Sequence, residues 1–395
     1  MTNEQRFFVQ ILSDHLNGRK SEARHDLDWD ALLCYANNHQ VSGMLFQQCA
    51  AFLPESVAPI LRKRHASELF YYFNREKLFK QIADALSAAE IPFFSVKGLE
   101  VARFYPVPAL RTMGDCDIVV HAPDRERAHE CLMALGFENK QRNDLEWMYL
   151  KNNMLVELHA HMLYDEAANS QADQAAADSA WSHAHPTGEG SRYELDWSFH
   201  FFFLLMHLKK HLIHSGVGFR QFMDLVVVMR CCELDWPWIE QQLRQLDLLP
   251  YARIVFALLE RWFGVSAPLK GANLTEVFYD EATEKVFANG IFGFSDEENQ
   301  DAAQMRRLAS SERPRWLTRG AYLAGVMFPR YRDMRYVPQY KFLDGRPWLL
   351  PAAWLYRYIF VLRNKKSTGD HAIAATFIPD EKLAARQQEL TKWGL

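Results

Sequence analysis

Three acidic residues carry the strongest chemical signal in this sequence. Asp115 and Asp117 flank Cys116 at the start of an apolar run. Side chains alternate along a strand, so both carboxylates should project from one face while Cys116 points to the other. Two like charges this close are unfavourable unless a cation lies between them, and Mg²⁺ prefers carboxylates together with substrate phosphates. The pair therefore predicts a divalent-metal site on a strand.

A third carboxylate, Glu157, lies inside a later apolar run, where an acid needs a partner. If this run forms a strand beside the first, Glu157 joins Asp115 and Asp117 in a catalytic, three-carboxylate site for Mg²⁺ or Mn²⁺. Such a site suits two-metal phosphoryl transfer. His159 would share the face of Glu157 and hydrogen-bond a carboxylate or the acceptor, although a buried structural role accounts for it equally well.

A phosphate-binding segment is predicted upstream of the acidic pair. A short apolar run ends at Lys97-Gly98, which suits a strand that turns into a short helix. Backbone without a Cβ at a helix N-terminus can approach phosphate oxygens closely, and Lys97 and Arg111 add cations. We therefore expect Lys97, Gly98, Arg111 and His159 to bind the nucleotide. Lys97 could instead be a surface lysine, and Arg111 could pair with one of the two aspartates without touching a substrate.

These residues lie in a short segment of mixed character within a chain that otherwise shows helical patterns. Residues 59–90 have helical apolar spacing with no internal Gly. Further on, strand patterns cover 92–96, 116–120, 145–150 and 155–159, and helical patterns cover 99–104 and 124–135. The alternation predicts an α+β fold in which a small sheet-containing core is embedded in a mainly helical protein.

The same patterns divide the chain into four expected regions. They are an N-terminal helical region at 1–90, the core at 91–165, a helical domain at 166–300 and a basic, aromatic-rich C-terminal region at 301–395. Within the third region, helical patterns cover 199–214, 219–232 and 238–263.

Two pairs of residues in the third region have helical spacing. His207 and His211 have the i, i+4 spacing of a zinc pair, but no third ligand is evident. We therefore favour a helix face that lines the nucleotide cleft. Arg220 and Asp224 are also four apart and are most simply an intrahelical ion pair.

Composition narrows the class of protein. The chain has 395 residues, of which 49% are hydrophobic and 24% charged, so a disordered or collagen-like chain is excluded. Its six cysteines include no CxxC pair and indicate reduced thiols. The N-terminus lacks a basic stretch followed by an apolar one, and no apolar run reaches about 18 residues. We therefore expect a cytoplasmic location.

The charge is unevenly distributed. Residues 302–366 contain 14 Lys and Arg against three acids, a balance of 14 − 3 = +11, whereas the whole chain carries −4. The remainder therefore carries −15, which disfavours a long nucleic acid lying across the protein. Aromatic residues are interleaved with the cations. They could form a core, stack on bases, or hold an anionic acceptor at a membrane surface. We favour a small or lipid-linked anionic acceptor with peripheral membrane contact over nucleic acid.

The order of these motifs resembles the bacterial "uncharacterised nucleotidyltransferase" family, within the superfamily of DNA polymerase beta and the aminoglycoside nucleotidyltransferases. The matching positions are Lys97-Gly98, Tyr105-Pro106, Arg111, Asp115, Asp117, Glu157, His159, His207, His211, Gly218, Arg220 and Asp224. The superfamily's usual Gly-Gly or Gly-Ser is Lys-Gly here. The resemblance implies a mixed-sheet nucleotidyltransferase core that moves an NMP group from an NTP to an acceptor hydroxyl or phosphate with a divalent metal. It also implies a role in polysaccharide biosynthesis.

Two other functions are compatible with these residues. The first is a non-catalytic nucleotide-binding or antitoxin-like module, which would bind NTP and metal without turnover. The second is a toxin-like, RNA-modifying nucleotidyltransferase, which would bind RNA in a steeply salt-sensitive way.

Overall fold

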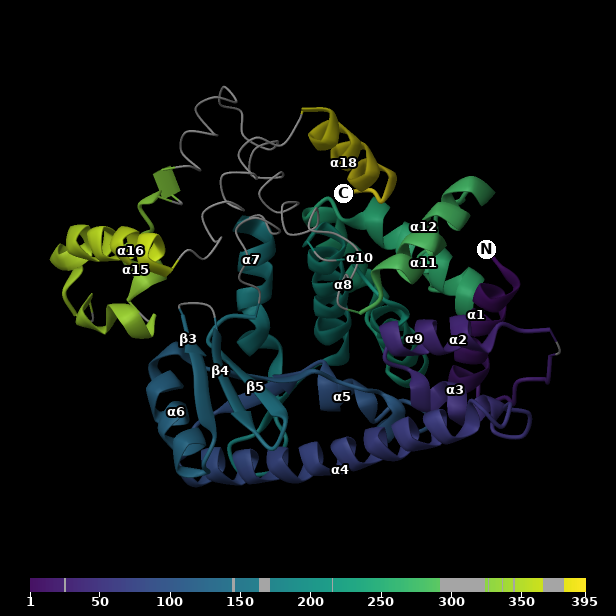
Figure 1. Cartoon of the computed structure of the whole chain (residues 1–395), viewed down its shortest axis with the longest axis horizontal. Coiled ribbons are helices and arrows are strands. Elements are labelled where there is room, and N and C mark those ends of the chain that lie inside the picture. Colours follow the sequence, from purple (N-terminus) through teal and green to yellow (C-terminus); the bar gives the residue numbers. More distant parts are fainter. Residues whose placement is uncertain are drawn as a thin grey trace.

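The structure is a computed structural model, and it describes residues 1–24, 26–143, 146–162, 171–214, 216–291, 324–325, 327–335, 337–343, 345–364 and 380–395. A five-stranded mixed sheet lies within a mainly helical protein (Figure 1). The predicted α+β fold with a small mixed sheet is thereby confirmed.

The N-terminal region consists of helices. They are α1 (Asn3–Leu16), α2 (Trp29–Asn38), α3 (Ser42–Cys49) and α4 (Ala58–Ala88). At the start of α1 the side chains of Thr2 and Gln5 each accept from the other's backbone N–H, which forms a capping box. Helix α4 has Pro59 in its first turn, where a missing N–H is harmless. The helix is 31 residues long in total, and the sequence pattern predicts a long helix here.

The sheet follows α4 along the chain. Its strands are β1 (Phe93–Val96), β2 (Asp115–Val120), β3 (Glu138–Arg142), β4 (Glu146–Lys151) and β5 (Met154–His159). They lie in the order β1-β2-β5-β4-β3, with β2 and β5 parallel and the other neighbours antiparallel. Between them lie α5 (Gly98–Ala102), the short η1 turn (Pro108–Leu110) and α6 (Arg125–Ala134). The edge strand β3 was not expected, because its sequence ENKQR has no apolar alternation.

The two faces of the sheet have different roles. Cys116, Ile118, Val156 and Leu158 belong to a buried apolar cluster with residues of α4 and α6. Alternation along β2 and β5 then places the acidic side chains on the opposite face, toward helix α8 (Trp197–His214). In Figure 1, α4 runs beneath the sheet and α8 stands above it.

In its described residues, the helical region after the sheet contains five α-helices in addition to α8 and three shorter elements. These elements are α7 (Gln171–Asp178), η3 (Ser179–His183), β6 (Ala184–Pro186), β7 (Tyr193–Leu195), α9 (Phe219–Cys231), α10 (Trp236–Gln245), α11 (Leu249–Phe263) and α12 (Glu276–Asn289). The helix expected over 238–263 is in fact two helices, because Asp247 between them has a positive φ of 55°. Residues of α1–α3 and α8–α12 share one hydrophobic core. The division into four regions stays a prediction.

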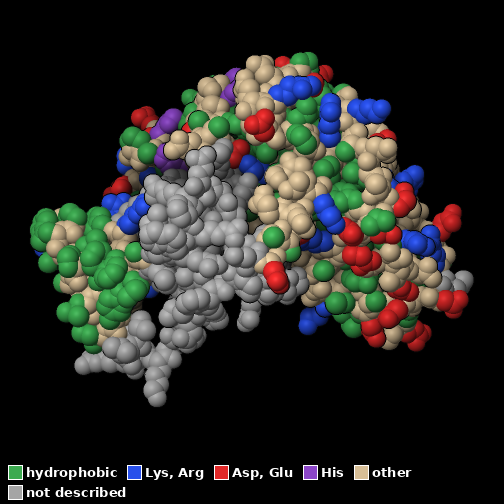
Figure 2. Space-filling view, turned by 90° about the horizontal axis from the view of Figure 1, so that it is seen from above, with side chains coloured by type: hydrophobic (Ala, Val, Ile, Leu, Met, Phe, Trp, Pro, Cys, Tyr) green, Lys and Arg blue, Asp and Glu red, His purple; other side chains and the backbone are tan. Residues whose placement is uncertain are grey.

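The described C-terminal part forms a separate small lobe and a final helix. Its elements are α15 (Tyr331–Met334), η4 (Pro338–Leu343), η5 (Pro347–Leu349), α16 (Leu350–Asn364) and α18 (Asp380–Lys392). Met334, Tyr340, Leu343 and Ala353 form the core of the lobe. Figure 2 shows hydrophobic side chains gathered on the surface of this lobe, and Trp348 and Leu355 are 70% and 63% exposed. Across the part of the chain that the structure describes, no helix has both the length and the apolar character needed to span a membrane.

Candidate active site

Parallel pairing of β2 and β5 brings two of the predicted acids together. Asp117 lies directly opposite Glu157, and Asp115 lies opposite Leu155. His159 Nε2 lies 3.2 Å from Asp117 Oδ1 and 3.4 Å from Glu157 Oε2. One ligand atom from each of Asp117, Glu157 and His159 falls within 4.8 Å of the others. Oxygen-rich groups of this kind fit a hard divalent cation such as Mg²⁺ or Mn²⁺.

Asp115 stands two residues before Asp117 at the start of β2, on the same face and half-buried. It is not one of the three residues that approach one another within 4.8 Å. Burial, followed by the negative charge of Asp117, raises the pKa of Asp115 above its ordinary value. A cation beside Asp115 would relieve the repulsion between the two carboxylates. The predicted role of Asp115 as a metal ligand stays a prediction.

Lys97 lies inside the acidic site. Its Nζ is 2.9 Å from Asp117 Oδ1 and 3.2 Å from His207 Nε2, and its side chain is 16% exposed. The alternative of a surface lysine is therefore wrong. Its backbone has a φ of 57°, unfavourable for a residue with a Cβ, and its N–H donates to His200 Nε2 at 3.0 Å.

Opposite charges govern the protonation of this cluster. Burial on its own lowers the pKa of Lys97, but Asp117, Asp115 and Glu157 raise it above its ordinary value. Burial would raise the pKa of Asp117, but Lys97 and His159 hold it well below its usual range. Burial opposes the charge on His159, yet hydrogen bonds to Asp117 and Glu157 raise its pKa to about 9. Lys97 and His159 are therefore both held in their charged forms beside the carboxylate of Asp117.

Helix α8 forms the opposite wall of the site. His200, His207 and His211 recur along it, and His207 and His211 bring their Nε2 atoms to 3.2 Å. Burial, then the charge of Lys97, lowers the pKa of His207 well below its ordinary value, and burial lowers that of His200 to about 3. In the described segments no third metal-ligating residue joins His207 and His211. His207 accordingly faces Lys97 as a neutral side chain.

Arg111 has a different partner from those considered from the sequence. Its Nη2 and Nε lie 2.6 Å and 3.1 Å from the two oxygens of Asp224 on α9, and Tyr105 donates to the same carboxylate at 2.7 Å. Arg220 instead donates to the carbonyl oxygen of Thr112 at 2.8 Å. The intrahelical Arg220–Asp224 pair is therefore wrong, because the segment before β2 lies against α9. The nucleotide contact of Arg111 stays a prediction.

Gly98 is the first residue of α5, as the turn motif predicts. A Cβ added there would lie 3.6 Å from the carbonyl oxygen of Asp115 and 3.7 Å from Met113 Sδ, which are ordinary contacts. Packing therefore does not require glycine at this position, and the positive φ of the turn belongs to Lys97 instead. The predicted phosphate contact of Gly98 stays a prediction.

Two nearby residues were missed by sequence reasoning. His200 accepts the backbone N–H of Lys97 and so fixes that backbone. It could have been found in the sequence because it lies seven residues, about two helical turns, before His207. Glu146 begins β4 opposite His159, and burial followed by the charge of Glu157 raises its pKa. The signal for Glu146 was a charged residue at the start of an alternating run.

A match to a protein family agrees with the motif order. Residues 25–264 match the family described as "Uncharacterised nucleotidyltransferase". No curated protein matches the chain. A solution structure of the antibiotic-resistance factor ANT(2'')-Ia is similar at 13% sequence identity and a TM-score of 0.32. The match covers 48% of this chain and 96% of that one.

Proposed function

The chain belongs to the uncharacterised nucleotidyltransferase family, and we propose that it transfers an NMP group from an NTP to an acceptor hydroxyl or phosphate and releases pyrophosphate. The observation that carries this proposal is the pairing of Asp117 with Glu157 across parallel strands, with Lys97 and His159 against the same carboxylates. Carboxylates and cations in one half-buried site suit the handling of a metal-bound triphosphate.

In the proposed reaction, the acceptor oxygen attacks the α-phosphorus and the bond from that phosphorus to the bridging oxygen of the β-phosphate breaks. Asp115, Asp117 and Glu157 would hold Mg²⁺ or Mn²⁺, which when bound supplies orientation of the triphosphate and a lower pKa of the acceptor hydroxyl. Glu157 takes up the proton of the acceptor, and Lys97 and His159 offset negative charge on the phosphates.

Other residues around the turn between β1 and α5 are proposed to support binding of the nucleotide. Gly98 lets phosphate oxygens approach the backbone, and Lys97 offers its ammonium group beside it. Arg111 is proposed to act on the nucleotide while Asp224 holds its guanidinium. His207 packs against Lys97 from α8 and would direct its ammonium group into the site.

For the acceptor, we propose a small or lipid-linked anionic molecule, used in polysaccharide biosynthesis. The net charge of +11 over residues 302–366 supports an anionic partner. The exposed Trp348 and Leu355 of the lobe support peripheral contact with a membrane surface. Of the aromatic residues in this region, Trp316, Tyr322 and Tyr336 lie outside the described residues, and Tyr340 is part of the core of the lobe.

The direct test incubates the protein with each α-labelled NTP, Mg²⁺ or Mn²⁺ and a cell extract. Label should appear in a non-nucleic-acid product, and only when metal is present. Asp117→Asn is the inactive control. Metal-dependent NTP binding without any labelled product would instead identify a non-catalytic module. Label in RNA, removed by ribonuclease, would identify an RNA-modifying enzyme.

The membrane contact has a separate test. Binding to anionic vesicles and to tRNA is compared at two salt concentrations, for the natural protein and for Arg332→Glu/Arg335→Glu. We expect vesicle binding that the double substitution weakens. Tight, salt-sensitive binding of tRNA without vesicle binding would contradict this proposal.

A further inference from the structure

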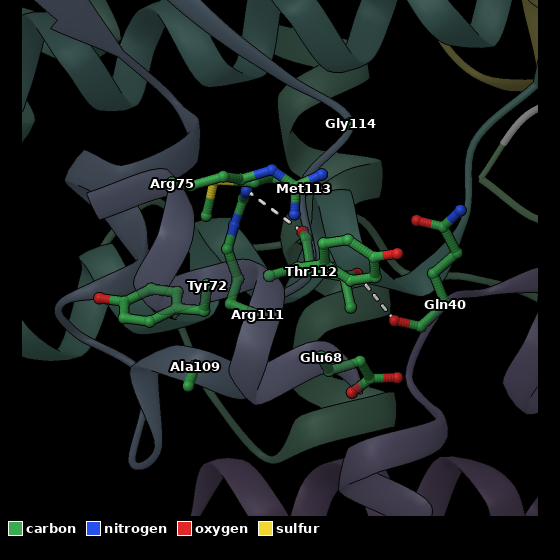
Figure 3. A pocket seen from close by; sticks show the side chains of 10 residues that line it. Gln40, Glu68, Tyr72, Arg75, Ala109, Arg111, Thr112, Met113 and Gly114 are labelled. Atoms are coloured by element: carbon green, nitrogen blue, oxygen red, sulfur yellow. Dashed lines mark hydrogen bonds between the residues drawn. The ribbon is translucent and has the colours of Figure 1, made fainter. Parts of the chain in front are cut away.

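A cavity of about 230 Å³ lies between α4 and the segment that leads into β2 (Figure 3). Residues that line it include Gln40, Glu68, Tyr71, Arg75, Arg111 and Thr112. Gly114 also lines it and is followed directly by Asp115, so this cavity adjoins the acidic end of β2. Ligand pockets typically measure about 300–1,000 Å³, so the cavity suits part of a ligand, such as one sugar ring and a charged group.

Most charged groups around the cavity already have protein partners. The guanidinium of Arg111 is held by Asp224, and the carboxyl of Glu68 accepts the N–H of Gly43 at 3.0 Å. Burial raises the pKa of Glu68 to about 8, which leaves this carboxyl largely uncharged at neutral pH. The acid that lines the cavity therefore contributes little negative charge.

Arg75 differs from these residues. It is half-buried on α4, and its guanidinium lies over the ring of Tyr71 at 5.8 Å. Within the described part of the chain, no carboxylate lies within 4.0 Å of its guanidinium, although the negative charge of Asp115 partly offsets the lowering of its pKa by burial. The planar guanidinium group binds phosphate or carboxylate through paired N–H donors, so Arg75 offers the cavity an anion site. Gln40, Thr112 and two tyrosine rings supply polar and flat surfaces for an attached hydroxylated ring.

The position of the cavity sets it apart from Lys97 and His207, although Arg111 lines it as well. Lys97 and His207 lie on the side of α8, above the sheet, whereas Arg75 comes from α4, which runs beneath it (Figure 1). In an in-line displacement the attacking and leaving groups lie on opposite sides of the phosphorus. The cavity is therefore placed to supply the attacking group, which would reach the acids on the α8 face around the end of β2, past Gly114 and Asp115.

We propose that this cavity is the acceptor subsite and that it takes a small sugar or polyol bearing a phosphate or carboxylate group, which Arg75 binds. This inference rests on the proposed nucleotidyl transfer. It locates the anionic group of the acceptor on α4, next to Asp115, and leaves a hydroxyl of the same molecule free to reach the acids.

The test measures binding in the absence of NTP and metal, so that the measured affinities depend on the cavity and not on the transfer reaction. Glucose 6-phosphate, glucuronate and neutral glucose are titrated calorimetrically against the full chain at constant ionic strength. We expect at least one of the two anions to bind at least ten-fold more tightly than glucose, and their order distinguishes phosphate from carboxylate. Arg75→Gln should weaken anion binding about ten-fold or more, and Arg75→Lys should restore part of it.

Lys77→Gln provides the matched control, because Lys77 is an exposed cation two residues further along α4 and does not line the cavity. It should leave all three affinities unchanged, and Arg75→Gln should leave the affinity for ATP with Mg²⁺ unchanged. The proposal is overturned if neither sugar anion binds more tightly than glucose, or if Arg75→Gln and Lys77→Gln act alike. Equal loss of ATP affinity in Arg75→Gln would assign the cavity to the nucleotide, and selective loss of binding to a 5′-phosphorylated oligoribonucleotide would assign it to RNA. Failure of nucleotidyl transfer alone would leave these binding results intact.

Discussion

Two buried ion pairs lie close together in this chain, but their surroundings differ. Arg111 and Asp224 meet through two contacts of 2.6 Å and 3.1 Å, and Tyr105 donates to the same carboxylate. Lys97 and Asp117 meet at 2.9 Å. The acceptor oxygens of the first pair are satisfied, and Arg220 interacts electrostatically with the same carboxylate, which suits a fixed joint between α9 and the segment before β2.

The second pair has an excess of acid around it. Asp115 and Glu157 add two carboxylates, and His159 is a further cation that contacts Asp117. Lys97 also adopts a positive φ, a costly backbone for a residue with a side chain. Clustered acids and backbone strain that occur together in one site are typical of binding or catalytic sites. The comparison teaches that burial of an ion pair alone does not distinguish structural from functional charges.

The largest expected effect concerns the pair of Arg111 and Asp224. Asp224→Asn leaves the guanidinium of Arg111 buried without its counter-ion, so the free energy of unfolding should fall by about 3–5 kcal/mol. Urea unfolding followed by circular dichroism measures it. Asp84→Asn, which removes an exposed ion pair with Lys80 on α4, should change it by about 0.5 kcal/mol or less. Similar losses in the two variants would show that Arg111 and Asp224 do not form a structural joint.

Asp117→Asn should separate catalysis from stability in the second pair. Removing one member of a preorganised electrostatic site costs about 10²–10³ in rate, so NTP turnover should fall by that factor. The free energy of unfolding should fall less than in Asp224→Asn, because the substitution also relieves repulsion with Asp115 and Glu157. Glu157→Gln should behave likewise. Unchanged turnover in either variant would contradict the three-carboxylate site.

Lys97→Ala tests whether the cation of this pair also serves the nucleotide. A charge-assisted contact with phosphate contributes about 1.5–3 kcal/mol, so NTP affinity should fall about ten- to hundred-fold. Titration of NTP with Mg²⁺ measures it, with the exposed Lys80→Ala on α4 as control. Equal dissociation constants for Lys97→Ala and the natural protein would show that Lys97 pairs with Asp117 without contributing to nucleotide binding.

A further expected effect is a difference in pH dependence between the two pairs. The pKa of His159 in the folded protein, about 9, exceeds its ordinary value of 6.5 because of Asp117 and Glu157, which outweigh burial. Its contribution to stability is therefore complete below about pH 6.5 and lost as the pH rises through 9. In metal-free protein the loss should be about 3 kcal/mol, and it should be absent in His159→Gln. A natural protein whose stability stays constant over this range would contradict the contact of His159 with Asp117.

Local patterns alone determined much of this protein. Apolar runs and helical spacing predicted α4 and four of the five strands, because these signals depend on neighbours within one element. Alternation along β2 correctly placed Asp115 and Asp117 on one face and Cys116 on the other. The chemical types of the site residues were likewise readable, since paired acids in an apolar run need a cation or a hydrogen-bond donor beside them.

Tertiary structure decided the features that depend on distant partners. Asp117 lies opposite Glu157 only because β2 and β5 pair in parallel and in that register. Arg111 binds Asp224 and not Asp115, although Asp115 is only four residues away in the sequence. Packing of the segment before β2 on α9 decides which carboxylate Arg111 contacts. The edge strand β3 has no apolar alternation and forms because β4 offers it a backbone ladder. Periodicity reports which face of an element is buried, whereas register, ion-pair choice and cavities arise from contacts between elements, and these exist only once the chain has folded.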